Sequence, residues 1–438
     1  EPDAAITNRF ILYGLGLLLI ASLGHLGPTM TDTVRRQASL EHDSSRALAG
    51  IRVVDLTQNI AGPHCTQILA DLGADVIKVE PPAGDPTRQW GPPFWEGESP
   101  LFLAFNRNKR SVLLDLKSDD GKDVLERLVD RADIFVQAFR AGVIDELGFG
   151  YEEIRQSHPG MVYASVTGYG SRGPLRERPG YDPLIQAYTG IMSLTGHPEG
   201  DPARVGGSVV DVGTGIVTAL GILAALREKE RTGEGTHVES SLLATSLGWV
   251  SYHIQGYLAS GVIPGRMGTG ISMIAPYEAF HTSDGELMIS AGHDGIFERL
   301  CEALKLEELK GDERFTTNPL RVANRTELHG LIEEHTCKMT TAQLRHLLDQ
   351  NRVPSAPIHD MSDVVEEEQV HAEDLLEPSP HPRISDYRDI SFPLRFDGLR
   401  PTLRRAPPLH GEHNSEVLRE LGYSEDEMPV FVPAEPLP

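Results

Sequence analysis

The feature that most constrains this chain is a repeated alternation of short apolar runs with helix-length segments, which begins near Ala49. The apolar runs have the length of buried strands, and the segments between them have amphipathic helical spacing. We predict strands at 51–56, 76–80, 111–115, 133–137, 161–166 and 236–240, and helices at 65–72, 118–128 and 214–230. Strands separated by helices are typical of βαβ units, so this part of the chain is predicted to form a parallel sheet covered by helices.

The pattern changes after residue 240. Residues 280–292 are typical of a hairpin whose turn is Ser283-Asp284-Gly285, and helical spacing follows at 296–304, 326–335 and 341–350. This stretch predicts a smaller α+β domain. A Pro-rich segment at 378–408 and a short amphipathic helix near 415–421 follow it.

Charge and cysteine content exclude several classes of partner. The net charge of -24 argues against nucleic acid and against an anionic membrane surface. The three cysteines are far apart in sequence, without the spacing of a metal site or a disulfide framework, which indicates a reducing compartment such as the cytoplasm.

The first 30 residues include a strongly apolar stretch at 10–23. Its length would permit a short membrane helix or a signal sequence, but the flank before it carries Glu1 and Asp3 and only Arg9 as a cation. We interpret residues 1–48 as a leader outside the fold and do not expect a membrane partner. A real anchor or leader peptide is the alternative.

Three carboxylates stand among glycines and prolines: Asp182 in P-G-Y-D-P, Glu199 in T-G-H-P-E-G and Asp211 in V-V-D-V-G-T-G. Asp211 ends an apolar run and precedes the long apolar helix, so the pattern alone favours a helix cap. A helix N-terminus would also keep a carboxylate ionised, as nucleophilic attack requires. Asp182 and Glu199 are each explained by turns, and Glu199 is expected to be solvated.

Ordered sequence segments carry a family resemblance. They are L-A-G-I-R-V-V-D-L-T-Q (48–58), A-G-P (61–63), L-A-D-L-G-A-D-V-I-K-V-E (69–80), N-R-N-K-R-S-V-L-L-D-L-K (106–117), S-V-T-G-Y-G (165–170), R-P-G-Y-D (178–182), R-T-G-E-G (231–235) and P-L-H-G-E-H (408–413). The set resembles the class III CoA-transferases (CaiB/BaiF type), which include formyl-CoA and carnitine CoA-transferases. Residues 249–325 are most similar to members that act on dicarboxylic acids.

The resemblance implies an α/β fold with a Rossmann-like large domain, a smaller α+β domain, and a homodimer whose two subunits interlock. It divides the chain into the leader at 1–48, the first part of the large domain at 49–231, a linker and small domain at 232–360, and a segment at 361–430 that returns to complete the large domain.

The resemblance also implies the chemistry. Asp211 matches the family's nucleophilic aspartate, which forms a mixed anhydride and then a CoA thioester, and Asp182 is the second candidate. The reactants would be an acyl-CoA, such as succinyl-CoA, and a free carboxylic acid, with no permanently bound cofactor and no metal. In the related racemase branch a catalytic His precedes the position of Asp182, where this chain has Tyr181.

Positions that match the family's CoA contacts follow several predicted strands, as ligands do in parallel sheets. They are Asn59, Ile60, Ala61, Leu114, Lys117, Phe139, Arg140 and Tyr169. Gly268, Thr269 and Gly270 in G-R-M-G-T-G resemble the glycine loop that covers the reacting thioester. Pro81 and Glu146 replace arginines that some members use, so the adenine end is expected to bind differently.

Two other functions stay open at this point. One is an acyl-CoA racemase that uses Asp211 as acid and base, and the other is a protein that binds CoA without turnover. The chain has no G-x-S-x-G motif, which disfavours a thioesterase of the α/β-hydrolase type.

Overall fold

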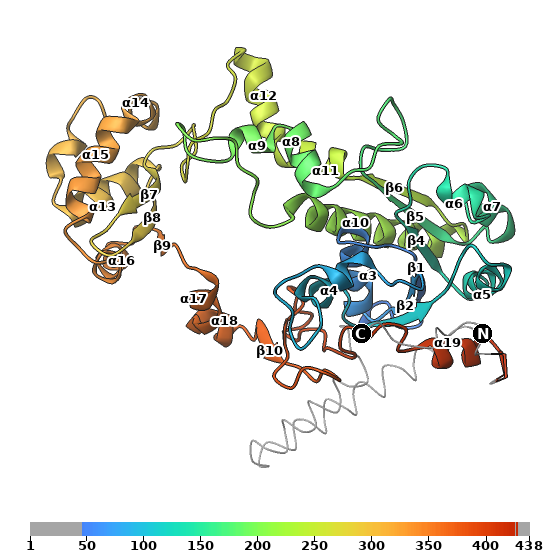
Figure 1. Cartoon of the computed structure of the whole chain (residues 1–438). Coiled ribbons are helices and arrows are strands. Elements are labelled where there is room, and N and C mark those ends of the chain that lie inside the picture. The colour runs from blue at the N-terminus through green and yellow to red at the C-terminus, as the bar shows by residue number, and fades with distance from the viewer. Residues whose placement is uncertain (1–45, 425, 428–438) are drawn as a thin grey trace, which may run out of the picture.

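The computed structural model describes residues 46–424, 426 and 427. The apolar stretch at 10–23 and nearly all of the predicted leader lie outside these residues. Leu48 is buried in the core, so the folded part includes this residue, which the predicted boundary left out. Figure 1 shows a large body around a parallel sheet and a small body around a second sheet, joined by two separate connections.

The large body is built on six parallel strands, which confirms the predicted α/β class. They are β1 (Arg52–Asp55), β2 (Asp75–Glu80), β3 (Lys109–Leu113), β4 (Ile134–Gln137), β5 (Val162–Thr167) and β6 (His237–Ser241). Their order is β3-β2-β1-β4-β5-β6. The order reverses between β1 and β4, and in such sheets ligands bind where the loops diverge at this switch point.

Both faces of the sheet are covered, because its strands are apolar on both sides. Val53 packs with α3 (Ala61–Asp71) and α10 (Val209–Thr232) on one face. Val54 packs on the other face with α5 (Asp119–Val129), α7 (Tyr151–Ser157) and α19 (Asn414–Glu420).

Helix ends follow local signals in two places. The Ser118 hydroxyl accepts the Gly121 N–H at the start of α5, where the sequence predicted a helix from residue 118. α10 ends at Gly233, whose φ of 79° is left-handed. By length and composition α10 could cross a membrane, but half of its most apolar window is buried, as in a core helix.

Shorter elements surround the sheet. They are the 3₁₀ turn η2 (Pro86–Gln89), α4 (Pro100–Phe105), α6 (Val143–Glu146), α8 (Asp182–Tyr188), α9 (Ile191–Leu194), α11 (Leu242–Trp249) and α12 (Ser251–Ser260). Of these, α12 has no buried residue.

The small body contains the predicted hairpin and helices. Its elements are β7 (Tyr277–His281), β8 (Glu286–Ser290), α13 (Asp294–Leu304), η3 (Glu307–Lys310), α14 (Asn318–Ala323), α15 (Arg325–Thr336), α16 (Thr341–Gln350) and β9 (Ser355–Pro357). All three strands are antiparallel, and the helices pack on them through Phe280, Leu287 and Leu328. β9 was not predicted, because three residues that include a proline give no strand pattern.

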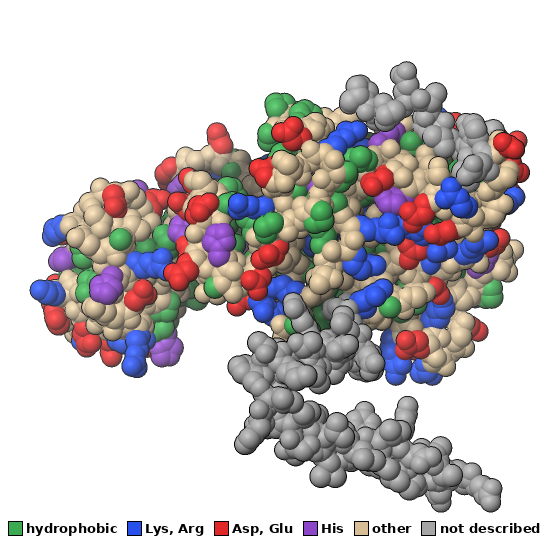
Figure 2. Space-filling model, turned by 90° about the horizontal axis from the view of Figure 1, so that it is seen from below, with side chains coloured by type: hydrophobic (Ala, Val, Ile, Leu, Met, Phe, Trp, Pro, Cys, Tyr) green, Lys and Arg blue, Asp and Glu red, His purple; other side chains and the backbone are tan. Residues whose placement is uncertain are grey.

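The chain then returns to the large body through α17 (Met361–Glu366), α18 (Glu368–Ala372), β10 (Leu376–Pro378), β11 (Arg388–Ile390) and α19. The Asn414 amide oxygen accepts the Leu113 N–H at 2.8 Å, and the His413 N–H donates to the Ser111 carbonyl at 3.0 Å. The end of the chain therefore covers the free edge of β3. Seen from below, acidic and basic side chains are intermixed over both bodies (Figure 2).

Candidate active site

A cavity of about 440 Å³ opens at the carboxyl ends of β1, β4 and β5, at the switch point of the sheet. We call it the switch-point cavity. It is lined by residues 58–62, 138–141, 166–168, 176 and 178–183, together with Leu56, Trp90, Arg204, Ser208, Asp211 and Leu242. Seven of the predicted site residues meet here: Asn59, Ile60, Ala61, Phe139, Arg140, Asp182 and Asp211.

Asp211 lies in the first turn of α10, where Asp182 holds the helix end. The N-cap residue Ser208 makes no side-chain cap. Asp182 Oδ2 instead accepts the backbone N–H of Val210 at 2.9 Å and that of Asp211 at 3.3 Å. Gln186 Nε2 donates to the other Asp182 oxygen at 2.5 Å. Asp182 therefore caps α10 from a distant segment and fixes the backbone of Asp211.

The carboxylate of Asp211 is harder to ionise than an ordinary aspartate. Burial and, after it, the nearby Asp182 carboxylate raise the pKa of Asp211 to about 7. The sequence led us to expect that the helix N-terminus would keep Asp211 ionised. That expectation is wrong, because burial and a like charge act in the opposite direction. At neutral pH the group is divided between an ionised carboxylate and a neutral acid.

The loop after β1 brings the start of α3 to the cavity. Asn59 has a left-handed φ of 67° and donates its backbone N–H to Asp85 Oδ1 at 3.3 Å. No side chain caps α3 at Ile60. The first-turn amides of this helix are thus available to an anion or a carbonyl oxygen in the cavity.

Buried ion pairs support this loop. Lys78 Nζ lies 2.8 Å from Asp85 Oδ2 and donates to the Thr57 carbonyl at 2.8 Å. Lys109 Nζ lies 3.2 Å from Asp55 Oδ2, and all four of these side chains are fully enclosed. We call these four residues the ionic layer.

Four arginines line the cavity: Arg140, Arg176, Arg178 and Arg204. Only Arg140 was predicted as a site residue. The others were missed because an exposed arginine in a loop gives no signal that separates a ligand contact from solvated charge. Arg178 does stand in the R-P-G-Y-D segment that carried part of the resemblance.

Three predicted CoA contacts lie outside the cavity lining. The Leu114 side chain is 2% exposed and packs in the core, and its N–H donates to the Glu80 carbonyl at 2.9 Å, so only its carbonyl is left for a ligand. Lys117 is exposed beyond the end of β3. The Tyr169 ring contacts that of Tyr188, with ring centroids 5.5 Å apart.

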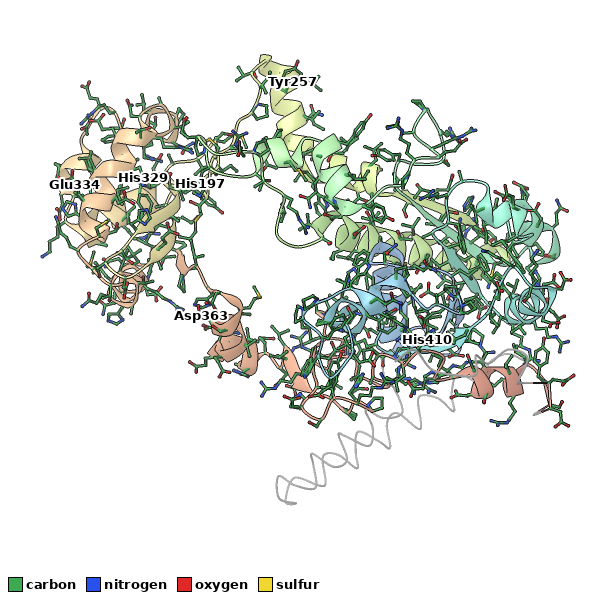
Figure 3. The ribbon with its side chains drawn as sticks, viewed as in Figure 1. His197, Tyr257, His329, Glu334, Asp363 and His410 are labelled. Carbon is green, nitrogen blue, oxygen red and sulfur yellow. The ribbon has the colours of Figure 1, made fainter. Side chains whose placement is uncertain are left out.

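The predicted glycine loop lines a second cavity. Gly270 faces this second space, which shares Ser208 with the switch-point cavity. The Gly268 N–H donates to the Gly196 carbonyl at 2.9 Å, and Thr269 Oγ1 accepts the Ala279 N–H at 2.9 Å. Figure 3 shows nearby His197 directed toward the small body. The loop therefore lines the second cavity, whose lining includes Val209 and Val212, rather than the switch-point cavity that contains Asp211.

Comparison with known proteins gives consistent results. The family described as CoA-transferase family III matches residues 48–414. The succinyl-CoA:glutarate CoA-transferase of Mus musculus is 38% identical over 380 residues, which cover 86% of this chain and 87% of the relative. The succinate–glutarate CoA-transferase of Agrobacterium fabrum is 39% identical, with 85% of this chain and 95% of the relative covered.

Solved structures share the fold as well. The crystal structure of a CaiB/BaiF family protein from Brucella suis aligns with a TM-score of 0.77 at 39% identity. The alignment covers 85% of this chain and 99% of that structure.

Proposed function

Since this chain belongs to CoA-transferase family III and is a CoA-transferase, we propose that it moves CoA from a dicarboxyl-CoA to a free carboxylic acid through Asp211. The observation that carries the role of Asp211 is its place in the switch-point cavity, half-buried and fixed by Asp182. Relatives that use succinyl-CoA or succinate support succinyl-CoA as the donor.

The reaction is a series of acyl transfers on one carboxylate. The ionised Asp211 attacks the thioester carbonyl of the donor, the C–S bond breaks, and a mixed anhydride and CoA thiolate result. The thiolate then attacks the Asp211 carbonyl of the anhydride, which releases the donor acid and leaves an aspartyl-CoA thioester. The acceptor carboxylate attacks this thioester to form a second anhydride and again frees the thiolate. Attack of the thiolate on the acceptor carbonyl gives the new acyl-CoA and regenerates Asp211.

The cavity suits these steps in two ways. Burial of Asp211 raises its pKa, and a more basic carboxylate is a stronger nucleophile once ionised. The start of α3 offers backbone amides for the oxyanion that forms when a carbonyl is attacked. Asp182 acts by positioning. CoA enters and leaves as a substrate, and we expect the enzyme to act in the cytoplasm.

The CoA moiety is proposed to bind along Asn59, Ile60, Ala61, Phe139 and Arg140, with Lys117, Tyr169 and the backbone of Leu114 at greater distance from Asp211. Among the arginines around the cavity, Arg140 supplies positive charge for a CoA phosphate in a chain of strong negative charge. Gly268, Thr269 and Gly270 are proposed to act as the substrate loop after a movement toward Asp211.

We further propose that the active form is an interlocked homodimer. Exposed apolar side chains gather on α10 to α12 and just beyond, with Leu220 66%, Leu258 69% and Ile263 80% exposed. Tyr257 of α12 points away from the rest of the chain in Figure 3. The two connections between the bodies close a ring (Figure 1), and the side chains drawn in Figure 3 leave its middle open in that view, as threading by a second chain requires. Sedimentation at the mass of a single chain would contradict this proposal.

Trapping of the intermediate tests the function. Protein incubated with succinyl-CoA and then with hydroxylamine should carry a hydroxamate on the peptide that contains Asp211, detected by mass spectrometry. Asp211→Asn should abolish the adduct, whereas Glu199→Gln, in a solvated turn outside the cavity, should retain it. An adduct on another carboxylate, or exchange of the substrate α-proton without any adduct, would overturn the proposal.

A further inference from the structure

We propose that Arg178 and Arg204 select dicarboxylic substrates by binding the carboxylate that does not react. The inference rests on the proposed function, because it assigns a second contact to a substrate whose first carboxyl group is at Asp211. Both arginines line the switch-point cavity together with Asp211. Dicarboxylic substrates follow from this arrangement, because one carboxyl group of the substrate can react at Asp211 while an arginine binds the other.

Both arginines are close in sequence to residues that build the site around Asp211. Arg178 precedes Asp182 by four residues, and Asp182 accepts the Asp211 N–H. Arg204 precedes Asp211 by seven residues on the segment that leads into α10. Neither forms an ion pair with Asp211 in the described part of the chain. Because both arginines and Asp211 line one cavity of about 440 Å³, a dicarboxylic acid bound there has a cation available for its second carboxylate.

The charge of these two arginines is not used inside the protein. Among residues 46–424, 426 and 427, Arg178 has no carboxylate partner, and Arg204 donates only to the carbonyls of Val205 and Gly206. Arg176 differs, because it pairs with Glu177 at 3.1 Å. Unpaired guanidinium groups beside a cavity can bind a carboxylate with two parallel hydrogen bonds.

The segment that carries Arg178 is held in place. A Cβ atom on Gly180 would lie 2.4 Å from the Gly168 Cα atom, so the two backbones are in direct contact. The Arg178 N–H donates to the Leu175 carbonyl at 2.9 Å, and Pro179 restricts the backbone of Arg178, the residue before it. A side chain that starts from a fixed backbone has fewer positions to sample, and a substrate without the second carboxylate gains nothing from the cation.

The test compares succinyl-CoA with butyryl-CoA as donors for Arg178→Gln and Arg204→Gln. We expect kcat/KM for succinyl-CoA to fall at least about tenfold more than that for butyryl-CoA, while the dissociation constant of free CoA stays within about twofold. Arg178→Lys should recover part of the preference. The control is Arg172→Gln, in the same exposed loop but outside the cavity lining, which should match the wild type.

One result would overturn the inference about the arginines, and another would overturn the proposed function. If both donors lose activity equally and free CoA binds more weakly in the same proportion, the arginines hold CoA phosphates and the inference is overturned. If the wild-type enzyme transfers CoA from neither donor to any acid, the proposed function itself fails.

Discussion

The ionic layer and the switch-point cavity both contact the loop after β1, but charges are paired in the ionic layer and partly unpaired in the cavity. In the ionic layer Lys78 lies against Asp85 and Lys109 against Asp55, with every side chain fully enclosed. In the cavity Arg178 has no carboxylate partner in the part of the chain described, and Asp211 has another carboxylate as its neighbour. The first arrangement stabilises a loop, and the second leaves charge available to a ligand.

The difference has a physical basis. A fully buried charge without a counterion costs several kcal/mol, so a buried lysine needs a partner within the protein. Half-buried and exposed groups can remain unpaired at lower cost. Unpaired charge that faces the cavity is therefore consistent with the proposed site at this sheet edge, whereas the charges beneath the loop are paired within the protein.

The largest predicted effect comes from breaking a pair in the ionic layer. Lys78→Met leaves Asp85 buried without its cation, and it also removes the hydrogen bond to the Thr57 carbonyl. We expect the free energy of unfolding to fall by about 3 to 5 kcal/mol. Urea unfolding followed by circular dichroism measures this change.

The matched control is an exposed ion pair of similar length. Arg227 Nη1 lies 2.9 Å from Glu230 on the solvent side of α10. Arg227→Met should change the free energy of unfolding by less than about 1 kcal/mol. Equal losses in Lys78→Met and Arg227→Met would show that burial does not distinguish the two sets of charges.

In the switch-point cavity, the pH dependence of turnover is expected to show a smaller effect. The pKa of Asp211 is raised to about 7, and in the proposed mechanism only its ionised form attacks, so kcat/KM should rise with pH and level off above pH 8. Between pH 6 and pH 8 the increase should be about tenfold. Initial rates over this range, with substrate well below KM, measure the apparent pKa.

Asp182 provides the variant that moves this profile. Asp182→Asn removes the second cause of the raised pKa but keeps an acceptor for the α10 amides, so the midpoint should shift to lower pH. Glu199→Gln, an acidic residue outside the cavity, should leave the midpoint in place. A midpoint that stays near pH 7 in Asp182→Asn would show that the charge of Asp182 does not raise the pKa of Asp211.

Strands such as β1 and β4 were predictable from the sequence because they are buried on both faces and contain apolar runs. The prediction of the start of α10 was less accurate. It was predicted at residue 214, whereas the helix begins at Val209. The cap is supplied by Asp182, a residue of another segment, and local sequence patterns do not reveal such a partner.

The site was predictable where it depends on strand ends. Asn59 and Arg140 follow different strands, and the parallel sheet brings both to one edge. Arg178 and Arg204 were missed, because only the fold shows which exposed arginines lack a partner. The prediction that Asp211 stays ionised was wrong for the same reason, since its burial and its distance to Asp182 are three-dimensional properties.

The smallest predicted effect separates two CoA contacts that the sequence treated alike. Arg140 lines the cavity, whereas Lys117 is exposed outside its lining. A charge-assisted hydrogen bond to phosphate within the cavity is stronger than a solvated contact. Arg140→Ala should therefore weaken CoA binding about tenfold and Lys117→Ala about twofold, as measured by calorimetry. Equal weakening would extend the binding surface to the end of β3, and an unchanged dissociation constant in Lys117→Ala would remove that residue from the site.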